Sequence, residues 1–195
     1  MPILMLTNNI IRFPALATPQ SMGEGEPAYG GKFPIEPDSD TSRAIEAAML
    51  EAAAQKWEKE DPKKILAMLI EDKKVCFERK PYKSKKNGEV YNGFEGMWTL
   101  GSRTPANKPQ PSVFNKYGEP VTETSKIEQL IYDGSRVNAK VEFWAQDNKY
   151  GRRINCSLLG VMFAADGKSF GGGAGPASAD DFAGFTAKPD AEDVL

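Results

Sequence analysis

Hydrophobic and polar residues alternate with the two-residue period of a β-strand in several stretches of the chain. The first stretch, residues 3–17, is expected to form a strand. Pro14 and Pro19 limit it, and they predict an edge strand or a bulge because proline lacks the N–H that a central strand needs. After a turn at Gly23–Gly25, a second short strand is expected over Ala28–Ile35.

The clearest alternation lies near the C-terminal end, over residues 136–144, where every second residue from Val137 is apolar. A polar, glycine-containing turn at 147–151 follows, and residues 153–163 provide a matching apolar stretch. This order predicts a β-hairpin.

Two helices are predicted between the early and late strands. Asp38, Ser39 and Asp40 are N-cap candidates for an alanine-rich helix over residues 41–60. Asp61-Pro62 then begins a second helix, because Asp is a good N-cap and Pro fits the first helical turn. Together they form a helical insert over about residues 41–72.

Between residues 73 and 132 the apolar runs are short and interrupted by Gly and Pro, which predicts short strands joined by long loops. The expected strands are 75–77, 90–91, 96–100 and 112–114, with a turn at 115–118 and either one helical turn or the start of a strand at 126–132. The chain therefore predicts a mainly β, OB-fold-like antiparallel barrel of five to seven strands over residues 1–170. Residues 171–195 are glycine-rich and predict a flexible tail.

Composition narrows the function. The 195 residues include no histidine, which removes imidazole bases and the common zinc ligand sets. The acids outside the tail are scattered or lie beside lysines, so we expect no catalytic residue, no metal and no cofactor, and a binding protein instead of an enzyme. Cys76 and Cys156 are expected to be reduced core thiols. No apolar run is long enough to span a membrane, and the N-terminus lacks the features of a signal peptide.

Charge is divided unevenly along the chain. Residues 171–195 hold five acids and one lysine, a formal charge of −4, whereas the whole chain is −2. Residues 73–117 hold ten bases and three acids, a charge of +7, with seven interleaved aromatic residues. Cations neutralise phosphates and aromatic faces stack on unpaired bases, so this mixture is typical of single-stranded nucleic-acid binding.

The candidate nucleic-acid-binding residues are the bases and aromatics of this segment together with those of the hairpin turn. They are Arg79, Lys80, Tyr82, Lys83, Lys85, Lys86, Tyr91, Phe94, Trp98, Arg103, Lys108, Phe114, Lys116, Tyr117, Lys149, Tyr150, Arg152 and Arg153. Core packing is the simpler role for Trp98 and Phe114, and the four tyrosines are as well explained by loop packing as by stacking.

The tail has two interpretations. It is either a solubilising end or a ligand whose apolar residues dock in a partner while its acids meet a basic rim; it could also cover the protein's own basic groove. The residues concerned are Asp180, Asp181, Phe182, Phe185, Asp190, Glu192, Asp193, Val194 and Leu195.

Residues 138–163, followed by Asp166-Gly167, Phe170-Gly171-Gly172 and the 179–182 tail segment, resemble a family of bacteriophage single-stranded DNA-binding proteins with an OB-fold. These are distant relatives of the helix-destabilising replication protein of short-tailed coliphages. The resemblance implies sequence-independent binding of single-stranded DNA during phage replication, recombination or repair, in the cytoplasm of the infected bacterium. It also implies an acidic C-terminus that contacts replication proteins and other copies of the chain.

The expected function is therefore single-stranded DNA binding in a groove lined by residues 79–117 and the 148–153 turn, with the tail moderating access. A homo-oligomer is compatible with the sequence. The first alternative is a phage protein-interaction module whose basic surface binds an acidic protein. The second, more remote, is a carboxylate-dependent nuclease.

Overall fold

The predicted hairpin forms the two longest strands of the described chain. The computed structural model describes residues 1–21 and 25–170, and in it β7 (Arg136–Asn148) and β8 (Gly151–Ala165) pair antiparallel along their whole length. The turn between them is only Lys149-Tyr150. Alternate residues such as Val141, Phe143 and Leu158 are fully buried, which is the period that the sequence predicts.

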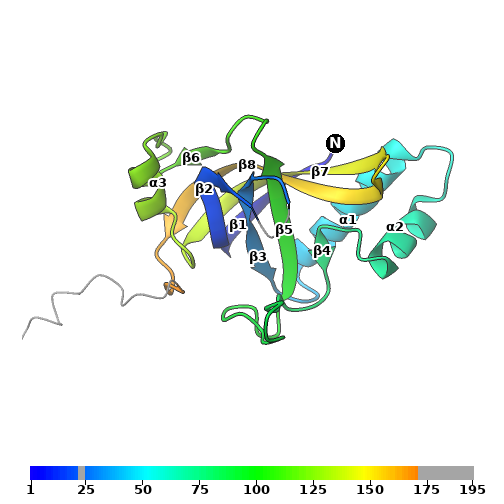
Figure 1. Ribbon diagram of the computed structural model, residues 1–195, viewed down its shortest axis with the longest axis horizontal. Coiled ribbons are helices and arrows are strands. Elements are labelled where there is room, and N and C mark those ends of the chain that lie inside the picture. Colours follow the sequence, from blue (N-terminus) through cyan, green and yellow to red (C-terminus); the bar gives the residue numbers. More distant parts are fainter. Residues whose placement is uncertain (22–24, 171–195) are drawn as a thin grey trace, which may run out of the picture.

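Two four-stranded sheets make up the β structure of the described residues (Figure 1). In one sheet the strand order is β1-β7-β8-β6, where β1 is Ile3–Ile10 and β6 is Ser112–Phe114. In the other it is β2-β3-β5-β4, with β2 at Arg12–Gln20, β3 at Ala28–Ile35, β4 at Phe77–Glu78 and β5 at Trp98–Pro105. Every pair is antiparallel except β6 with β8, which is parallel.

The two sheets are joined along β5 and β8. The buried Thr104 hydroxyl donates to the Leu158 carbonyl oxygen at 2.8 Å and accepts from the Leu158 N–H at 3.0 Å. Residues 74–76 continue the seam, because the Ile154 N–H donates to the Lys74 carbonyl and the Gly101 N–H to the Cys76 carbonyl. The core lies between the sheets, with Leu6, Phe33 and Leu100 fully buried. The mainly β, OB-fold-like class is thus confirmed, with eight strands in the described part of the chain, two of them very short, where five to seven were expected.

The predicted strand at residues 3–17 is two strands. The chain passes from one sheet to the other at Ile11, and Phe13 has a positive φ of 51°. The buried Arg12 pairs with Asp133 at 2.7 Å, which holds the chain at this crossing. Pro14 and Pro19 both lie in β2, at the edge of its sheet, as expected of proline in a strand.

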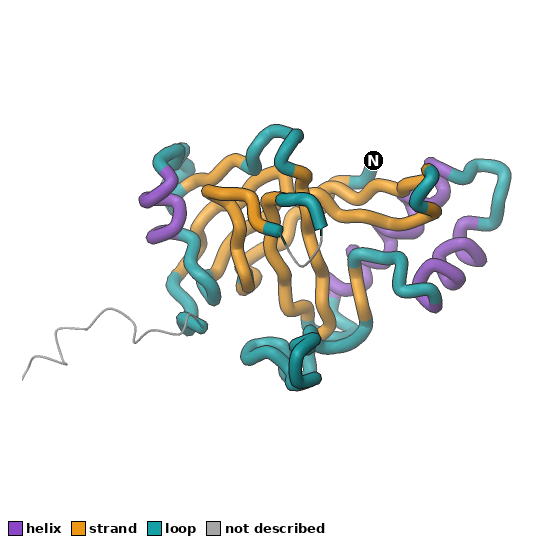
Figure 2. Tube along the Cα trace, viewed as in Figure 1, coloured by secondary structure: helices purple, strands orange, loops and turns teal. Residues whose placement is uncertain are grey.

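The helical insert is confirmed. Helix α1 (Asp40–Lys56) begins after an N-cap at Ser39, and α2 (Pro62–Glu71) begins after Asp61. The first helix ends four residues earlier than expected because Trp57 leaves the helical conformation and enters the core. Figure 2 shows α1 and α2 at one end of the molecule and α3 (Thr124–Leu130) at the other.

One predicted strand is absent from the described residues. Val90-Tyr91 lies in a long loop between β4 and β5, in which a single bridge joins Lys83 to Val90. Residues 126–132 are mostly helical, as part of α3. The predicted tail at 171–195, and part of the Gly23–Gly25 turn, lie outside the described residues.

Candidate nucleic-acid interface

A groove of about 440 Å³ runs between the two sheets, over β3, β5 and the β7–β8 hairpin. Val75, Cys76 and Glu78 also line it, from the segment after α2 that hydrogen-bonds to both β8 and β5. The groove therefore lies on the seam of the fold, and rigid strands supply most of its walls.

The strand period of β5 builds the groove wall. Thr99, Gly101, Ser102 and Arg103 line the groove, whereas Leu100 between them is fully buried in the core. Residues opposite each other on antiparallel strands share a face, and Lys32 of β3 is the register partner of Gly101. Lys32 therefore stands on the same wall as Arg103.

Three cations line the groove: Lys32, Arg103 and Arg153. Among the residues that the structure describes, no carboxylate forms a salt bridge with any of them. Among the described residues of the lining the acid is Glu78, which pairs with Lys80 at 2.7 Å. The groove is thus positive: Arg103 donates to the backbone carbonyl oxygen of Glu26, but within the described residues no carboxylate neutralises any of the three charges.

Lys32 is the most enclosed of these cations. Its Nζ lies 4.1 Å from the centre of the Tyr82 ring, a cation–π contact. Burial lowers the pKa of Lys32 below its usual value; nearby Glu78 opposes this shift and Lys85 adds to it. An enclosed cation that makes no salt bridge within the described residues is a candidate functional group.

The hairpin supplies the opposite wall. Trp144 and Asn155 are register partners, as are Gln146 and Arg153, and all four side chains line the groove. The Trp144 indole N–H donates to the Ser157 hydroxyl at 3.0 Å, which fixes the orientation of the ring. This wall combines an aromatic face, two amides and a cation.

An aromatic cluster adjoins the groove at Phe13 and Lys32. Tyr82 and Tyr91 stack with their ring centres 5.2 Å apart, and Phe13 packs edge-on against both. Phe94 is fully buried in the same cluster. Burial raises the pKa of Tyr82, as do the nearby Tyr91 and Glu78, so this phenol stays neutral at physiological pH.

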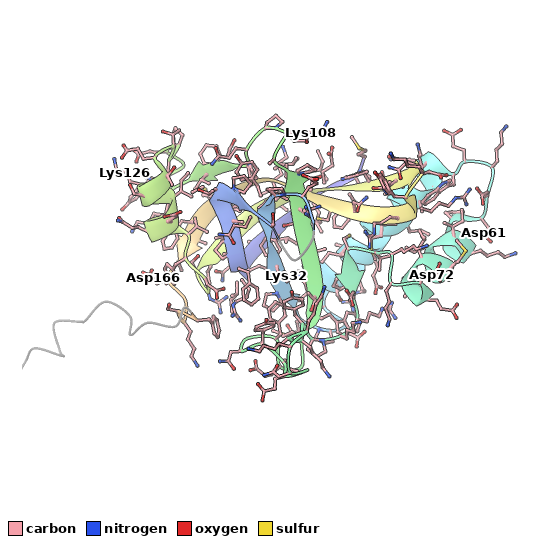
Figure 3. All side chains as sticks on the ribbon, viewed as in Figure 1. Lys32, Asp61, Asp72, Lys108, Lys126 and Asp166 are labelled. Atoms are coloured by element: carbon pink, nitrogen blue, oxygen red, sulfur yellow. The ribbon has the colours of Figure 1, made fainter. Side chains whose placement is uncertain are left out.

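The structure does not gather the eighteen predicted residues into one groove. Of the eighteen, Arg103 and Arg153 line it, and the role of the others in DNA binding stays a prediction. Lys108, Phe114, Lys116 and Tyr117 belong to or adjoin β6, and Figure 3 shows Lys108 well away from Lys32. Lys149 and Tyr150 form the hairpin turn, where Tyr150 is 77% exposed.

Several other predicted residues are engaged within the protein. Arg79 pairs with Glu46 and lies over Trp98, which itself packs on Phe77. Phe94 has no exposed face for stacking, because its side chain is fully buried. Tyr82 and Tyr91 are half-buried in the cluster, and Lys83, Lys85 and Lys86 are exposed on the same loop.

Arg152 is also engaged. It makes two hydrogen bonds of 2.9 Å to Glu60 and lies 3.3 Å from Asp147. The hydrogen bonds that Arg152 donates to Glu60 raise the pKa of Arg152. This arginine joins the hairpin to the helical insert.

Lys32, Trp144, Phe13 and Tyr29 line the groove but were missed as site residues. Lys32 is a single base within a glycine-containing strand, and Trp144 closes an alternating strand that suggests packing. The hairpin alternation was the one usable signal, because it places Trp144 and Gln146 on the face opposite the buried Phe143.

Both cysteines are free, and Cys156 is buried while Cys76 is partly exposed. Burial raises the pKa of the Cys156 thiol, and its contact with Cys76 adds to the shift. Within the described residues no group of three or more potential ligands could hold a metal ion. In the same part of the chain no helix has the length and apolar character needed to cross a membrane. All the predicted tail residues lie outside the described part.

Solved structures show which class of protein shares this fold. The single-stranded DNA-binding protein of bacteriophage Enc34, in complex with single-stranded DNA, superposes with a TM-score of 0.68 at 23% identity, over 87% of this chain and 89% of that one. The gp2.5 single-stranded DNA-binding protein of bacteriophage T7 superposes with a TM-score of 0.51 at 13% identity, over 96% of both chains. The fold is therefore that of phage single-stranded DNA-binding proteins.

The sequence narrows this class to one family. A family model described as the ssDNA-binding protein of Enterobacter phage Enc34 matches residues 4–195, and the chain belongs to this family. A relative, the putative protein p50 of Acyrthosiphon pisum secondary endosymbiont phage 1, is 31% identical over 182 residues, which are 92% of this chain and 91% of the relative. The family is a class of DNA-binding proteins and not of enzymes. The phage family expected from residues 136–182 is thus confirmed.

Proposed function

We propose that this protein binds single-stranded DNA in the groove between its sheets, without strong sequence preference. The observation that carries the proposal is the set of three groove cations that have no carboxylate partner among the described residues. The bound strand releases counterions as Lys32, Arg103 and Arg153 neutralise its phosphates. Membership of a phage ssDNA-binding family and the DNA complex of the Enc34 protein support the same ligand.

Unpaired bases can use the aromatic and amide groups of the walls. Trp144 presents an aromatic surface whose orientation is fixed by its bond to Ser157, and stacking on such a ring is sequence-tolerant. Gln146 and Asn155 beside it can donate or accept, so they do not require one base. This mechanism contains no chemical step, and it suits a protein that protects single strands during phage replication, recombination or repair in the cytoplasm of the infected bacterium.

A titration tests the proposal. Fluorescent oligo-dT is mixed with the full chain at several salt concentrations, with and without magnesium. We expect an affinity that weakens steeply with salt, little change when dT is replaced by mixed sequence, and an intact oligonucleotide afterwards. Absence of binding at low salt contradicts the proposal and leaves the protein-interaction module; cleavage with magnesium indicates a nuclease.

The acidic tail is proposed to compete with DNA for the groove cations. Its charge of −4 is opposite to that of the groove, and it follows directly on the described residues. Deleting Asp180–Leu195 should therefore tighten DNA binding at low salt, and the gain should vanish at high salt. The same proposal includes contacts of the tail with replication proteins.

A matched variant separates charge from chain length. Replacing the five tail acids with Asn or Gln keeps the length and removes the charge, so it should tighten binding as the deletion does. If both variants bind DNA as the unmodified chain does, the tail does not compete for the groove.

A further inference from the structure

The wall of the groove has no side chain at one position of β5. Gly101 faces the groove between Thr99 and Arg103, and a Cβ there would lie 3.5 Å from Lys32 Nζ and 3.8 Å from the Cys76 carbonyl oxygen. Both are ordinary contacts, so packing does not require glycine here. At Gly31 on β3, by contrast, a Cβ would come within 2.9 Å of the Ile11 side chain.

Backbone conformation does not require this glycine either. Gly101 is absent from the glycines with positive φ in the described chain, and it lies inside a regular antiparallel pairing with β3. Glycine weakens the interior of a strand, and it often marks a site where a ligand or another backbone approaches closely. The nearest backbone atom is the Cys76 carbonyl oxygen, which accepts from the Gly101 N–H and lies at an ordinary contact distance from the Cβ position, while the groove beside Gly101 has room for a ligand.

A cation stands directly over this position. Lys32 is the register partner of Gly101, and its Nζ is in contact with the Tyr82 ring on one side. The charged groups that act on this ammonium are Glu78, which already pairs with Lys80, and Lys85. Three N–H donors on a compact charge suit a phosphate oxygen, and an aromatic ring does not satisfy them as an anion does.

We propose that one nucleotide of the bound strand lies against the backbone of Gly101 with its phosphate on the Lys32 ammonium. This subsite rests on the proposed function and deepens it. The missing Cβ lets the sugar-phosphate backbone approach β5, and the enclosed position of Lys32 makes the contact stronger than one on the surface. Arg103 and Arg153 then serve the neighbouring phosphates.

Gly101→Val tests the close approach of the DNA backbone to β5 without changing any charge. Valine favours strands and its side chain projects into the groove, so we expect a folded protein whose affinity for fluorescent oligo-dT falls about tenfold or more. Thermal unfolding monitored by circular dichroism checks that the variant is folded. Should valine prevent folding, Gly101→Ala adds only a methyl group at ordinary contact distances and should weaken binding in the same direction. A folded variant with unchanged affinity overturns the subsite.

Lys32→Met tests the phosphate contact. Each phosphate neutralised on a single strand contributes about 0.7 to the slope of log K against log salt, so this variant should lose about 0.7 of the slope and about tenfold in affinity at low salt. Lys126→Met is the matched control, because it removes the same charge from α3, away from Lys32 (Figure 3). Equal slopes for the two variants contradict the contact.

The two levels of inference fail in different ways. If the unmodified protein does not bind oligo-dT, the proposed function fails together with the subsite. If it binds with a steep salt dependence while the Gly101 and Lys32 variants behave like the control, only the subsite is wrong and the strand follows another path along the groove.

Discussion

Two arginines that follow each other on β8 lie in opposite environments. Arg152 faces the helical insert, where Glu60 and Asp147 hold it and Trp57 lies under its guanidinium at 5.3 Å. Arg153 faces the groove, and within the described residues its side chain has no hydrogen bond and no salt bridge. One charged side chain joins parts of the protein, and the next is available to a ligand.

The comparison shows that the basic character of a segment does not locate a binding site. The strand period sends neighbouring residues to opposite faces, so the two arginines have different partners. On the insert face, defined by Trp57, Glu60, Asp147 and Arg152, the acids form salt bridges that neutralise the positive charge of the arginine. On the groove face, no acid of the described residues neutralises the cations in this way.

The largest effect is expected on the insert face, from Trp57→Ala. Trp57 is 5% exposed, and its indole N–H donates to Asp147 at 2.8 Å. Truncation of a buried aromatic should lower the free energy of unfolding by about 3–5 kcal/mol. Denaturant unfolding monitored by circular dichroism measures this change.

Trp57→Phe is the control for this prediction. It keeps a buried ring and loses the bond to Asp147, so its cost should be clearly smaller than that of alanine. Both variants, while folded, should bind oligo-dT like the unmodified protein. Lost affinity in a folded Trp57→Phe variant would place DNA contacts on the insert face and break the comparison.

A smaller effect distinguishes the two arginines directly. Arg153→Glu should weaken DNA binding by more than about tenfold, because it removes one phosphate contact and repels the next phosphate, while the melting temperature stays the same. Arg152→Glu should act in the opposite way: it puts a third carboxylate beside Glu60 and Asp147, lowers the melting temperature and changes affinity little.

Anisotropy titrations and thermal melts of the two variants provide the measurement. If Arg152→Glu weakens binding as much as Arg153→Glu while remaining folded, both arginines contact DNA and the division into two faces does not hold.

Local elements could be predicted from the sequence because their signals are local. The N-caps Ser39 and Asp61 and the alternation along β7 act through neighbouring residues, and these elements appear where expected. The crossing at Ile11 could not be predicted, because it depends on the pairing of Arg12 with Asp133, which is 121 residues away in the chain.

The candidate site was harder to predict than the fold. The basic segment 73–117 is contiguous in sequence, but β5 passes through its middle and separates the loop before it from the strand β6 after it. Lys32 joins the groove only because β3 pairs with β5 at Gly101, a contact between residues far apart in the chain. Charge and aromatic content therefore predicted the ligand class of the family, and the tertiary pairing decides which residues can contact it.

The smallest expected effect is a pH dependence that separates Lys32 from ordinary surface lysines. Its pKa is lowered in the folded protein, chiefly by burial, so with rising pH it loses its proton before an exposed lysine does. In that window the unfolded chain binds more protons than the folded one, so the stability contributed by this group rises with pH while DNA affinity falls.

The Lys32→Arg variant tests this pH dependence, because arginine stays charged and the variant should lack the part of the affinity loss that comes from Lys32. Anisotropy titrations with oligo-dA between about pH 7 and pH 10 compare the two proteins, which share all other lysines, and the difference should be less than about tenfold because deprotonation is partial. Parallel curves for the two proteins would show that the Lys32 ammonium does not contribute to binding, and that the groove acts through Arg103 and Arg153 alone.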